Sequence, residues 1–240
     1  MEMKGKIALI TGASRGIGEC IAIRLATMGM KLILTGRDAE KLERLKNRIQ
    51  KIAPEPHIVV ADITSSETPK ILLEETIKMF GGIDLLVNNA GYAISKSLEE
   101  TDQVDWDKSM AVNARAPFFI CKEAIPYLKS STSATIINIS SVVGRLGYAH
   151  QAAYAASKHA LMGFSKVLAK EVQSYGIRVH TIAPGGVATD MVKTMRADLD
   201  VSKLIQPEEI ADIVEFLLKH RGNALIDNID VRRANGTPFA

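Results

Sequence analysis

Apolar and polar positions follow two alternating patterns along this chain. Short apolar runs typical of buried strands recur at residues 6–10, 31–35, 57–61, 83–87, 136–139, 176–183 and 224–231. Between these runs, apolar residues recur at helical spacing. Strands that alternate with helices from end to end are typical of an α/β fold, so the sequence predicts one α/β domain over residues 1–240.

A glycine-rich turn follows the first apolar run. Gly12, Gly16 and Gly18 separate residues 6–10 from a helical pattern that ends near Gly29. Glycines let the backbone approach a pyrophosphate, and a helix N-terminus offers free amide groups. The spacing differs from the commoner Gly-x-Gly-x-x-Gly. The order strand, loop, helix predicts a dinucleotide site, with an ordinary turn as the alternative.

The end of the second strand indicates which dinucleotide binds. Gly36 stands where an acidic side chain would hold a free ribose 2′-hydroxyl, and Arg15 and Arg37 flank the same place. Arginine binds a phosphate through two parallel hydrogen bonds, so the pattern predicts NADP rather than NAD. The alternative is that both arginines are solvated and that Asp38 binds the ribose.

Two later strand ends carry further candidate cofactor contacts. Asp62 and Ile63 follow the third strand, where adenine is expected. Asn89, Ala90 and Gly91 follow the fourth strand, at the point where open parallel sheets bind ligands. A simple turn of amides and glycine is the alternative there.

Tyr154 and Lys158 are the main candidate catalytic residues. They are four residues apart on a predicted helix that ends near Ser174, so they lie on one face. A phenol has a pKa of about 10, and a nearby ammonium is expected to lower it toward the working range. Ser141 follows the strand 136–139, where its hydroxyl is placed to hold a carbonyl oxygen. A solvated helix face is the alternative.

Two further segments have expected roles. Asn113 interrupts an apolar helical pattern over 102–128, and a buried amide there belongs to a packing network or a proton relay. Residues 190–206 have weak periodicity beside the expected cofactor, which indicates a lid that orders when ligands bind.

Composition excludes several other classes of protein. Thirty basic and 27 acidic residues give a net charge of +3, too small to indicate nucleic-acid binding. No apolar run approaches a membrane span, and the five histidines lack metal-ligand spacing, so neither a membrane nor a metal is expected. The first strand begins too early to leave room for a signal peptide. Cys20 and Cys121 lie in apolar patterns, which favours a reducing, cytoplasmic location.

Together these motifs resemble those of the short-chain dehydrogenase/reductase family over almost the whole chain. The residues that carry the resemblance are Thr11-Gly12-x-x-x-Gly16-x-Gly18, Asn88-Asn89-Ala90-Gly91, Asn113, Ser141, Tyr154-x-x-x-Lys158 and Pro184-Gly185. The resemblance implies a single-domain Rossmann fold, with a doubly wound, seven-stranded parallel sheet of order 3-2-1-4-5-6-7 and helices on both faces. It also implies a homodimer or homotetramer.

The resemblance assigns a role to each candidate residue. Tyr154 would be the acid/base, Ser141 would orient the carbonyl, and Lys158 would lower the phenol pKa and bind the nicotinamide ribose. Asn113 would hold a water that relays protons to Lys158. Ser140 competes for the serine role, but the thirteen-residue step to Tyr154 favours Ser141. The expected cofactor-binding residues are Gly12, Ser14, Arg15, Gly16, Ile17, Gly18, Arg37, Asp62, Ile63, Asn89, Ala90, Gly91, Tyr154, Lys158, Pro184, Gly185, Val187 and Thr189.

The two ends of the chain point to different relatives within the family. Residues 5–18 look most like 3-oxoacyl-[acyl-carrier-protein] reductases, whereas residues 230–236 replace the usual Val-Asp-Gly-Gly ending and look closer to sepiapterin-type and 3-hydroxy-acid reductases. The expected function is NADP(H)-dependent reduction of a small carbonyl compound, or oxidation of the alcohol. A 3-oxoacyl thioester, a pterin and a 3-hydroxy acid remain alternative substrates, and a non-catalytic cofactor sensor is a further alternative. Lys122 and Lys129 are placed to receive an acyl carrier protein or are simply solvated.

Overall fold

The computed structural model describes residues 3–195 and 199–237. Its centre is a seven-stranded, entirely parallel sheet of order β3-β2-β1-β4-β5-β6-β7, which confirms the expected order. The strands are β1 (Ile7–Thr11), β2 (Lys31–Gly36), β3 (His57–Val60), β4 (Leu85–Asn88), β5 (Thr135–Ile139), β6 (Arg178–Pro184) and β7 (Asn228–Val231). The single-domain organisation stays a prediction. It is favoured by the fact that all seven strands belong to one sheet.

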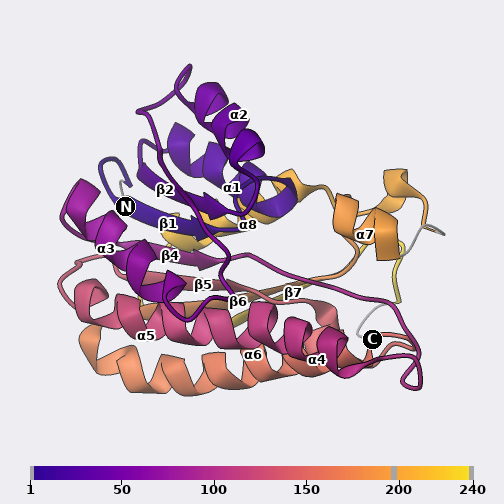
Figure 1. Cartoon of the computed structure of the whole chain (residues 1–240). Helices are drawn as coiled ribbons and strands as arrows, with labels where there is room; N and C mark the ends of the chain where they lie inside the picture. The colour runs from indigo at the N-terminus through magenta and orange to yellow at the C-terminus, as the bar shows by residue number, and fades with distance from the viewer. Residues whose placement is uncertain (1–2, 196–198, 238–240) are drawn as a thin grey trace.

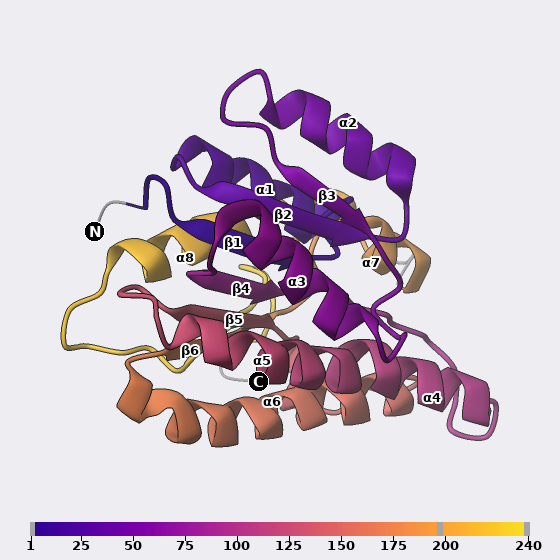
Figure 2. The same ribbon diagram turned by 60° about the vertical axis from the view of Figure 1, so that its left-hand side comes forward.

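Helices cover both faces of the sheet (Figures 1 and 2). On one face lie α1 (Gly16–Thr27), α2 (Ala39–Ile49) and α8 (Pro207–Lys219). On the other lie α3 (Thr68–Phe80), α5 (Ala116–Leu128) and α6 (Ala152–Val172). Two shorter helices, α4 (Gln103–Met110) and α7 (Asp190–Met195), lie near the carboxyl ends of the strands.

The two layers arise because successive strand residues point to opposite faces. Ala8 and Ile10 pack in the layer of α1 and α8, whereas Leu9 packs in the layer of α3 and α5. All three side chains are fully buried. Burying a leucine or isoleucine side chain stabilises the fold by about 1.5–3 kcal/mol, so strands that are apolar on both faces belong in the centre of this sheet.

The expected interruption at Asn113 is a change of helix type. A π-helical turn, Ala111–Arg115, joins α4 to α5, and the Ala116 amide donates to the Ala111 carbonyl five residues earlier. Pro117 falls in the first turn of α5, where a missing N–H costs nothing. Asn113 lies in the π turn and is completely buried.

The predicted lid contains α7 and a short 3₁₀ turn, Val201–Lys203; its residues 196–198 lie outside the described residues. Its ordering by ligands stays a prediction. Within the described parts of the chain, no helix is both long enough and apolar enough to cross a membrane.

Candidate active site

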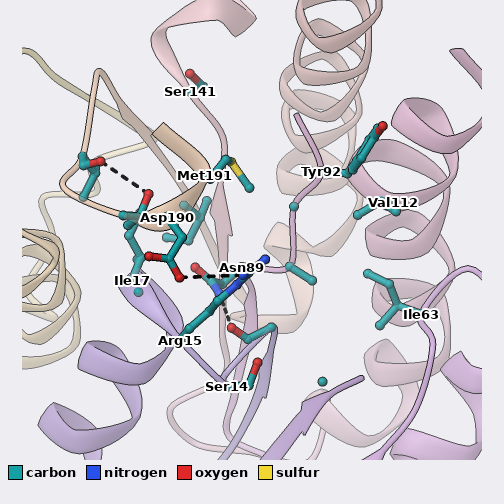
Figure 3. Close-up of a pocket in the computed structure, with 18 of the residues that line it drawn as sticks. Ser14, Arg15, Ile17, Ile63, Asn89, Tyr92, Val112, Ser141, Asp190 and Met191 are labelled. Atoms are coloured by element: carbon teal, nitrogen blue, oxygen red, sulfur yellow. Dashed lines mark hydrogen bonds and ion pairs between the residues drawn. The ribbon is translucent and has the colours of Figure 1, made fainter. Parts of the chain in front are cut away.

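A cavity opens at the carboxyl ends of the strands, beside the point between β1 and β4 where the strand order reverses (Figure 3). This is the usual ligand position in open α/β sheets. Eighteen of the predicted site residues line it: Gly12, Ser14, Arg15, Gly16, Ile17, Arg37, Asp62, Ile63, Asn89, Ala90, Gly91, Ser141, Tyr154, Lys158, Pro184, Gly185, Val187 and Thr189. Gly18 and Asn113 do not line it. Both instead contact segments that form its wall.

Gly18 lets the loop after β1 contact the loop after β4. A Cβ at Gly18 would lie 2.3 Å from the Gly12 carbonyl oxygen and 2.4 Å from Asn89 Nδ2. Gly12 has a φ of 63°, and a Cβ on it would lie 2.7 Å from the Ala90 Cα. The glycine pattern is therefore required by close packing of two loops as well as by any ligand.

Asn89 and Thr11 hold these two loops together. Asn89 Nδ2 donates to the carbonyls of Thr11 and Gly12 at 2.9 and 3.0 Å. The Thr11 hydroxyl accepts from the amides of Asn89 and Ala90, both at 3.0 Å. Thr11 was expected only as part of the motif, and the structure gives it this bridging role.

Arg15 and Arg37 lie at the rim of the cavity where the 2′-phosphate of NADP is expected. Arg15 also forms an exposed ion pair with Asp190 at 3.8 Å. Asp38, the alternative ribose ligand, is instead the N-cap of α2, where it accepts from the Lys41 amide at 3.0 Å. Its carboxylate does not line the cavity, so the alternative assignment is not supported.

At the other end of the cavity, α6 places Tyr154 and Lys158 on one buried face. The Lys158 ammonium donates to the Ile139 carbonyl at 2.9 Å. The Ser141 hydroxyl hydrogen-bonds the Tyr154 phenol and also donates to the Pro184 carbonyl at 3.3 Å. Helix spacing, the position of Ser141 after a strand and the family resemblance together predicted this cluster, and the structure brings its three members together.

Ser140, the competing serine, also lines the cavity. Its hydroxyl is buried and has no hydrogen-bond partner among the described residues. It is Ser141, and not Ser140, that bonds the Tyr154 phenol, so the geometry favours Ser141.

The expectation that Lys158 lowers the pKa of Tyr154 is wrong for the side chains of this chain alone. Burial raises the pKa of Tyr154 above its usual value, and the hydrogen bond with Ser141 lowers it by less. Lys158 does not reverse this shift, because its ammonium lies 6.0 Å from the centre of the phenol ring and donates to Ile139. Burial also lowers the pKa of Lys158 to about 8.

The Asn113 side chain belongs to a packing network. Its Oδ1 accepts from the Tyr92 amide at 2.9 Å, and its Nδ2 donates to the Tyr92 carbonyl at 2.7 Å and to Ser157 Oγ at 2.9 Å. These bonds tie the π turn to α6 and to the chain after β4. A water relay through Asn113 stays a prediction, because these side-chain bonds do not reach Lys158.

The sequence comparisons agree with this geometry. The family profile described as short chain dehydrogenase matches residues 6–200. The chain belongs to this family. Short-chain dehydrogenases are oxidoreductases, and the described fold has their parallel sheet and helix layers.

Individual relatives cover nearly the whole chain. A 3-oxoacyl-[acyl-carrier-protein] reductase of Vibrio cholerae is 36% identical over 225 residues, 90% of this chain and 91% of that protein. One from Aquifex aeolicus is 33% identical and covers 100% of this chain and 99% of its own. A metagenomic short-chain oxidoreductase solved with NADP is 32% identical, with a TM-score of 0.85 over 98% of this chain and 100% of its own.

The cavity of this short-chain dehydrogenase also contains residues that sequence patterns missed. They are Tyr92, Lys108 and Val112, whereas Asp190, Met191 and Val192, which also line the cavity, belong to the predicted lid. The Lys108 ammonium lies 4.4 Å from the centre of the Tyr92 ring, a cation–π contact at the cavity edge. Lys108 and Val112 are four residues apart on one helical stretch, but nothing in their residue types indicated a ligand.

Proposed function

We propose that this short-chain dehydrogenase is an NADP(H)-dependent carbonyl reductase or alcohol dehydrogenase. The observation that carries the proposal is the buried cluster of Ser141, Tyr154 and Lys158 at one end of a cavity whose other end is a glycine loop flanked by two arginines. The cluster is suited to proton transfer and the loop to binding a dinucleotide.

The described residues fit NADP. Gly12 and Gly18 leave a cradle that a Cβ would fill, and Gly16 and Ile17, in the first turn of α1, line the same cavity. We assign the 2′-phosphate to Arg15 and Arg37, adenine to Asp62 and Ile63, and the carboxamide to Val187 and Thr189. When bound, the cofactor supplies the hydride that reaches the carbonyl carbon.

The chain itself supplies orientation and the proton. Ser141 donates a hydrogen bond to the carbonyl oxygen and holds it next to Tyr154. The Tyr154 phenol stays protonated near neutral pH because burial raises its pKa, so it acts as the acid that protonates the developing alkoxide. Lys158 holds the ribose and returns a proton to the phenol.

For the substrate we propose a 3-oxoacyl thioester, the class named for the Vibrio and Aquifex relatives. A pterin or a 3-hydroxy acid is the alternative, because the ending at residues 230–236 differs from the usual reductase ending. The test is an NADPH-oxidation screen with acetoacetyl thioesters, diketones, pterins and 3-oxo acids. Oxidation with none of them contradicts the proposed activity and favours a cofactor sensor.

NADPH is expected to bind more tightly than NADH, and Arg37→Asp is expected to weaken or reverse that preference. Each lost arginine–phosphate pair costs about 1.5–3 kcal/mol, roughly a tenfold to hundredfold change in affinity. Fluorescence titration with both cofactors measures the preference. Arg44→Asp, an exposed α2 site that does not line the cavity, is the matched control. Equal dissociation constants for the two cofactors in the parent contradict the assignment.

We also propose that the protein forms a homodimer or homotetramer through α5 and α6, which lie side by side on the outside of the molecule (Figure 2). Phe118 and Phe119 on α5 are 46% and 42% exposed, and Val167 on α6 is 55% exposed. Light scattering is expected to give two or four times the chain mass of 26.1 kDa. A mass of one chain at micromolar concentration rules this out.

Contacts with an acyl carrier protein and a cytoplasmic location remain predictions. The Lys129 ammonium lies 3.8 Å from the centre of the Tyr175 ring and that of Lys122 5.9 Å from the Phe119 ring, so both lysines already contact aromatic rings of this chain.

A further inference from the structure

The chain after β7 continues at the end of the sheet where α7 lies (Figure 1). Pro184 pairs with Val231 in the β6–β7 ladder, and the Gly185 amide donates to the Val231 carbonyl at 2.7 Å. Pro184 and Gly185 line the cavity, and the Pro184 carbonyl accepts the hydrogen bond from Ser141. The residues that follow Val231 are therefore close to the catalytic serine.

Arg232 fixes the shape of this tail. Its Nη1 donates to the carbonyls of Arg233, Ala234 and Gly236 at 3.1, 3.3 and 3.0 Å. The Gly236 amide also donates to the Arg233 carbonyl at 2.9 Å. The Arg232 guanidinium is therefore engaged by the tail's own backbone, and the turn that it closes determines where Arg233 lies.

Arg233 is a cation that this turn leaves without a partner. Its side chain is half-buried, and its Cδ lies 3.8 Å from where a Cβ on Gly186 would be. Its guanidinium forms no hydrogen bond or ion pair with any of the described residues. Asp230, the nearest carboxylate in sequence, is already paired with Arg145 and hydrogen-bonded by Asn228. Partial burial of an unpaired charge costs free energy, which a ligand anion would offset.

The surroundings of Arg233 suit a molecule with a carbon chain and a charged end. Leu204 Cδ2 and Leu199 Cδ1 lie 3.1 and 3.8 Å from the same Cβ position on Gly186, so apolar groups lie beside the arginine stem. Gly186 follows directly after the cavity-lining Gly185. Arg233 therefore lies beside Gly186, next to the cavity-lining Gly185, with apolar side chains around its stem.

We propose that Arg233 binds an oxyanion of the substrate, a carboxylate or a phosphate, and so selects acidic carbonyl compounds over neutral ones. Arginine suits this role because its planar guanidinium offers two parallel hydrogen bonds to either group. The inference rests on the proposed carbonyl reductase function, and it names the substrate class for the same site.

The test compares acetoacetate with methyl acetoacetate, which share the reacting ketone and differ in charge. Arg233→Gln is expected to lower kcat/KM for acetoacetate tenfold to hundredfold, the usual value of a lost charge-assisted pair, and to change the value for the ester less than twofold. Arg233→Lys should restore part of the activity on the acid. Lys51→Gln, an exposed charge at the opposite end of the sheet, is the control. Equal losses of Arg233→Gln on acid and ester overturn the inference, and so does unchanged activity on the acid, the ester and the coenzyme A thioester of the next comparison.

A second pair of substrates distinguishes phosphate from carboxylate. Acetoacetyl-coenzyme A carries phosphates, whereas acetoacetyl-N-acetylcysteamine is a neutral thioester with the same ketone. A loss confined to the coenzyme A thioester in Arg233→Gln assigns the anion as a phosphate, and a loss confined to acetoacetate assigns it as a carboxylate. Either result supports an oxyanion site.

A binding measurement separates failure of this inference from failure of the proposed function. Calorimetric titration of the protein with NADP⁺ present uses acetoacetate and its methyl ester as probes, so no turnover is required. Tighter binding of the acid that Arg233→Gln abolishes supports the oxyanion site, even if the screen finds no reduction. The site is overturned, whether or not ketones are reduced, if the parent binds acid and ester equally and Arg233→Gln does not weaken the binding of acetoacetyl-coenzyme A.

Discussion

Tyr154→Phe is expected to lower carbonyl reduction by a factor on the order of 10²–10⁴, the usual contribution of a positioned proton donor. Phenylalanine keeps the ring and its packing on α6 and removes only the hydroxyl that Ser141 contacts. NADPH affinity should change little, because the expected phosphate contacts lie at Arg15 and Arg37. Steady-state kinetics with a reducible ketone, together with a cofactor titration, measure both quantities.

Tyr148→Phe is the control for that experiment, because Tyr148 is 45% exposed and does not line the cavity. It should retain the parent activity. A Tyr154→Phe enzyme that also keeps most of its turnover would show that another group moves the proton.

The pH dependence of the parent has an expected direction for each reaction. The pKa of Lys158 is lowered to about 8 by burial, so its ammonium is present below that pH and is lost above it. Reduction, which requires a protonated Tyr154 and Lys158, should therefore decline as the pH rises through about 8. Alcohol oxidation should rise over the same range, because the proton that Tyr154 takes from the alcohol is passed on to Lys158, which accepts it only in its neutral form. A reduction rate independent of pH from 7 to 9 argues against this role for Lys158.

Gly18→Ala is expected to damage both the fold and NADPH binding. The added Cβ would lie 2.3 Å from the Gly12 carbonyl oxygen, so the loop after β1 or the Asn89 side chain must move. Overpacking of this kind costs about 1–3 kcal/mol, and movement of the loop should weaken NADPH binding by at least tenfold. Thermal unfolding and a cofactor titration measure the two effects.

Gly222→Ala is the matched substitution for comparison. Gly222 has no atom within 4 Å of its expected Cβ and does not have a left-handed φ, so the variant should behave like the parent. If Gly18→Ala has the melting temperature and NADPH affinity of the parent, the contact between the two loops does not limit either property.

Patterns along the chain predicted the sheet and much of the site because both depend on local signals. Seven apolar runs predicted the strands, and the candidate catalytic residues fall at helix spacing, as Tyr154 and Lys158 do, or just after a strand end, as Ser141 does. In a parallel sheet the carboxyl ends of the strands meet at one edge, so residues far apart in sequence converge there. That geometry makes the location of the cavity predictable without coordinates.

The remaining features depend on packing that no local pattern contains. The raised pKa of Tyr154 follows from its burial, whereas the four-residue spacing to Lys158 suggested the opposite shift. Lys108 lies on α4 just before the π turn, and the Tyr92 backbone is bonded by Asn113 of that turn, so their positions at the cavity depend on tertiary packing. The bridging role of Thr11 depends on two loops that are 78 residues apart in sequence.

The π turn at Ala111–Arg115 has a consequence for how this protein tolerates changes in length. Asn113 is fastened to Tyr92 on one side and to Ser157 on the other, so the turn cannot slide along its neighbours. Deleting one residue from it would rotate α4 by about 100° and shift it by about 1.5 Å relative to α5. Exposed side chains in this stretch are expected to tolerate substitution, whereas a change in the number of residues is not, so insertions and deletions should be tolerated in surface loops such as 220–227 instead.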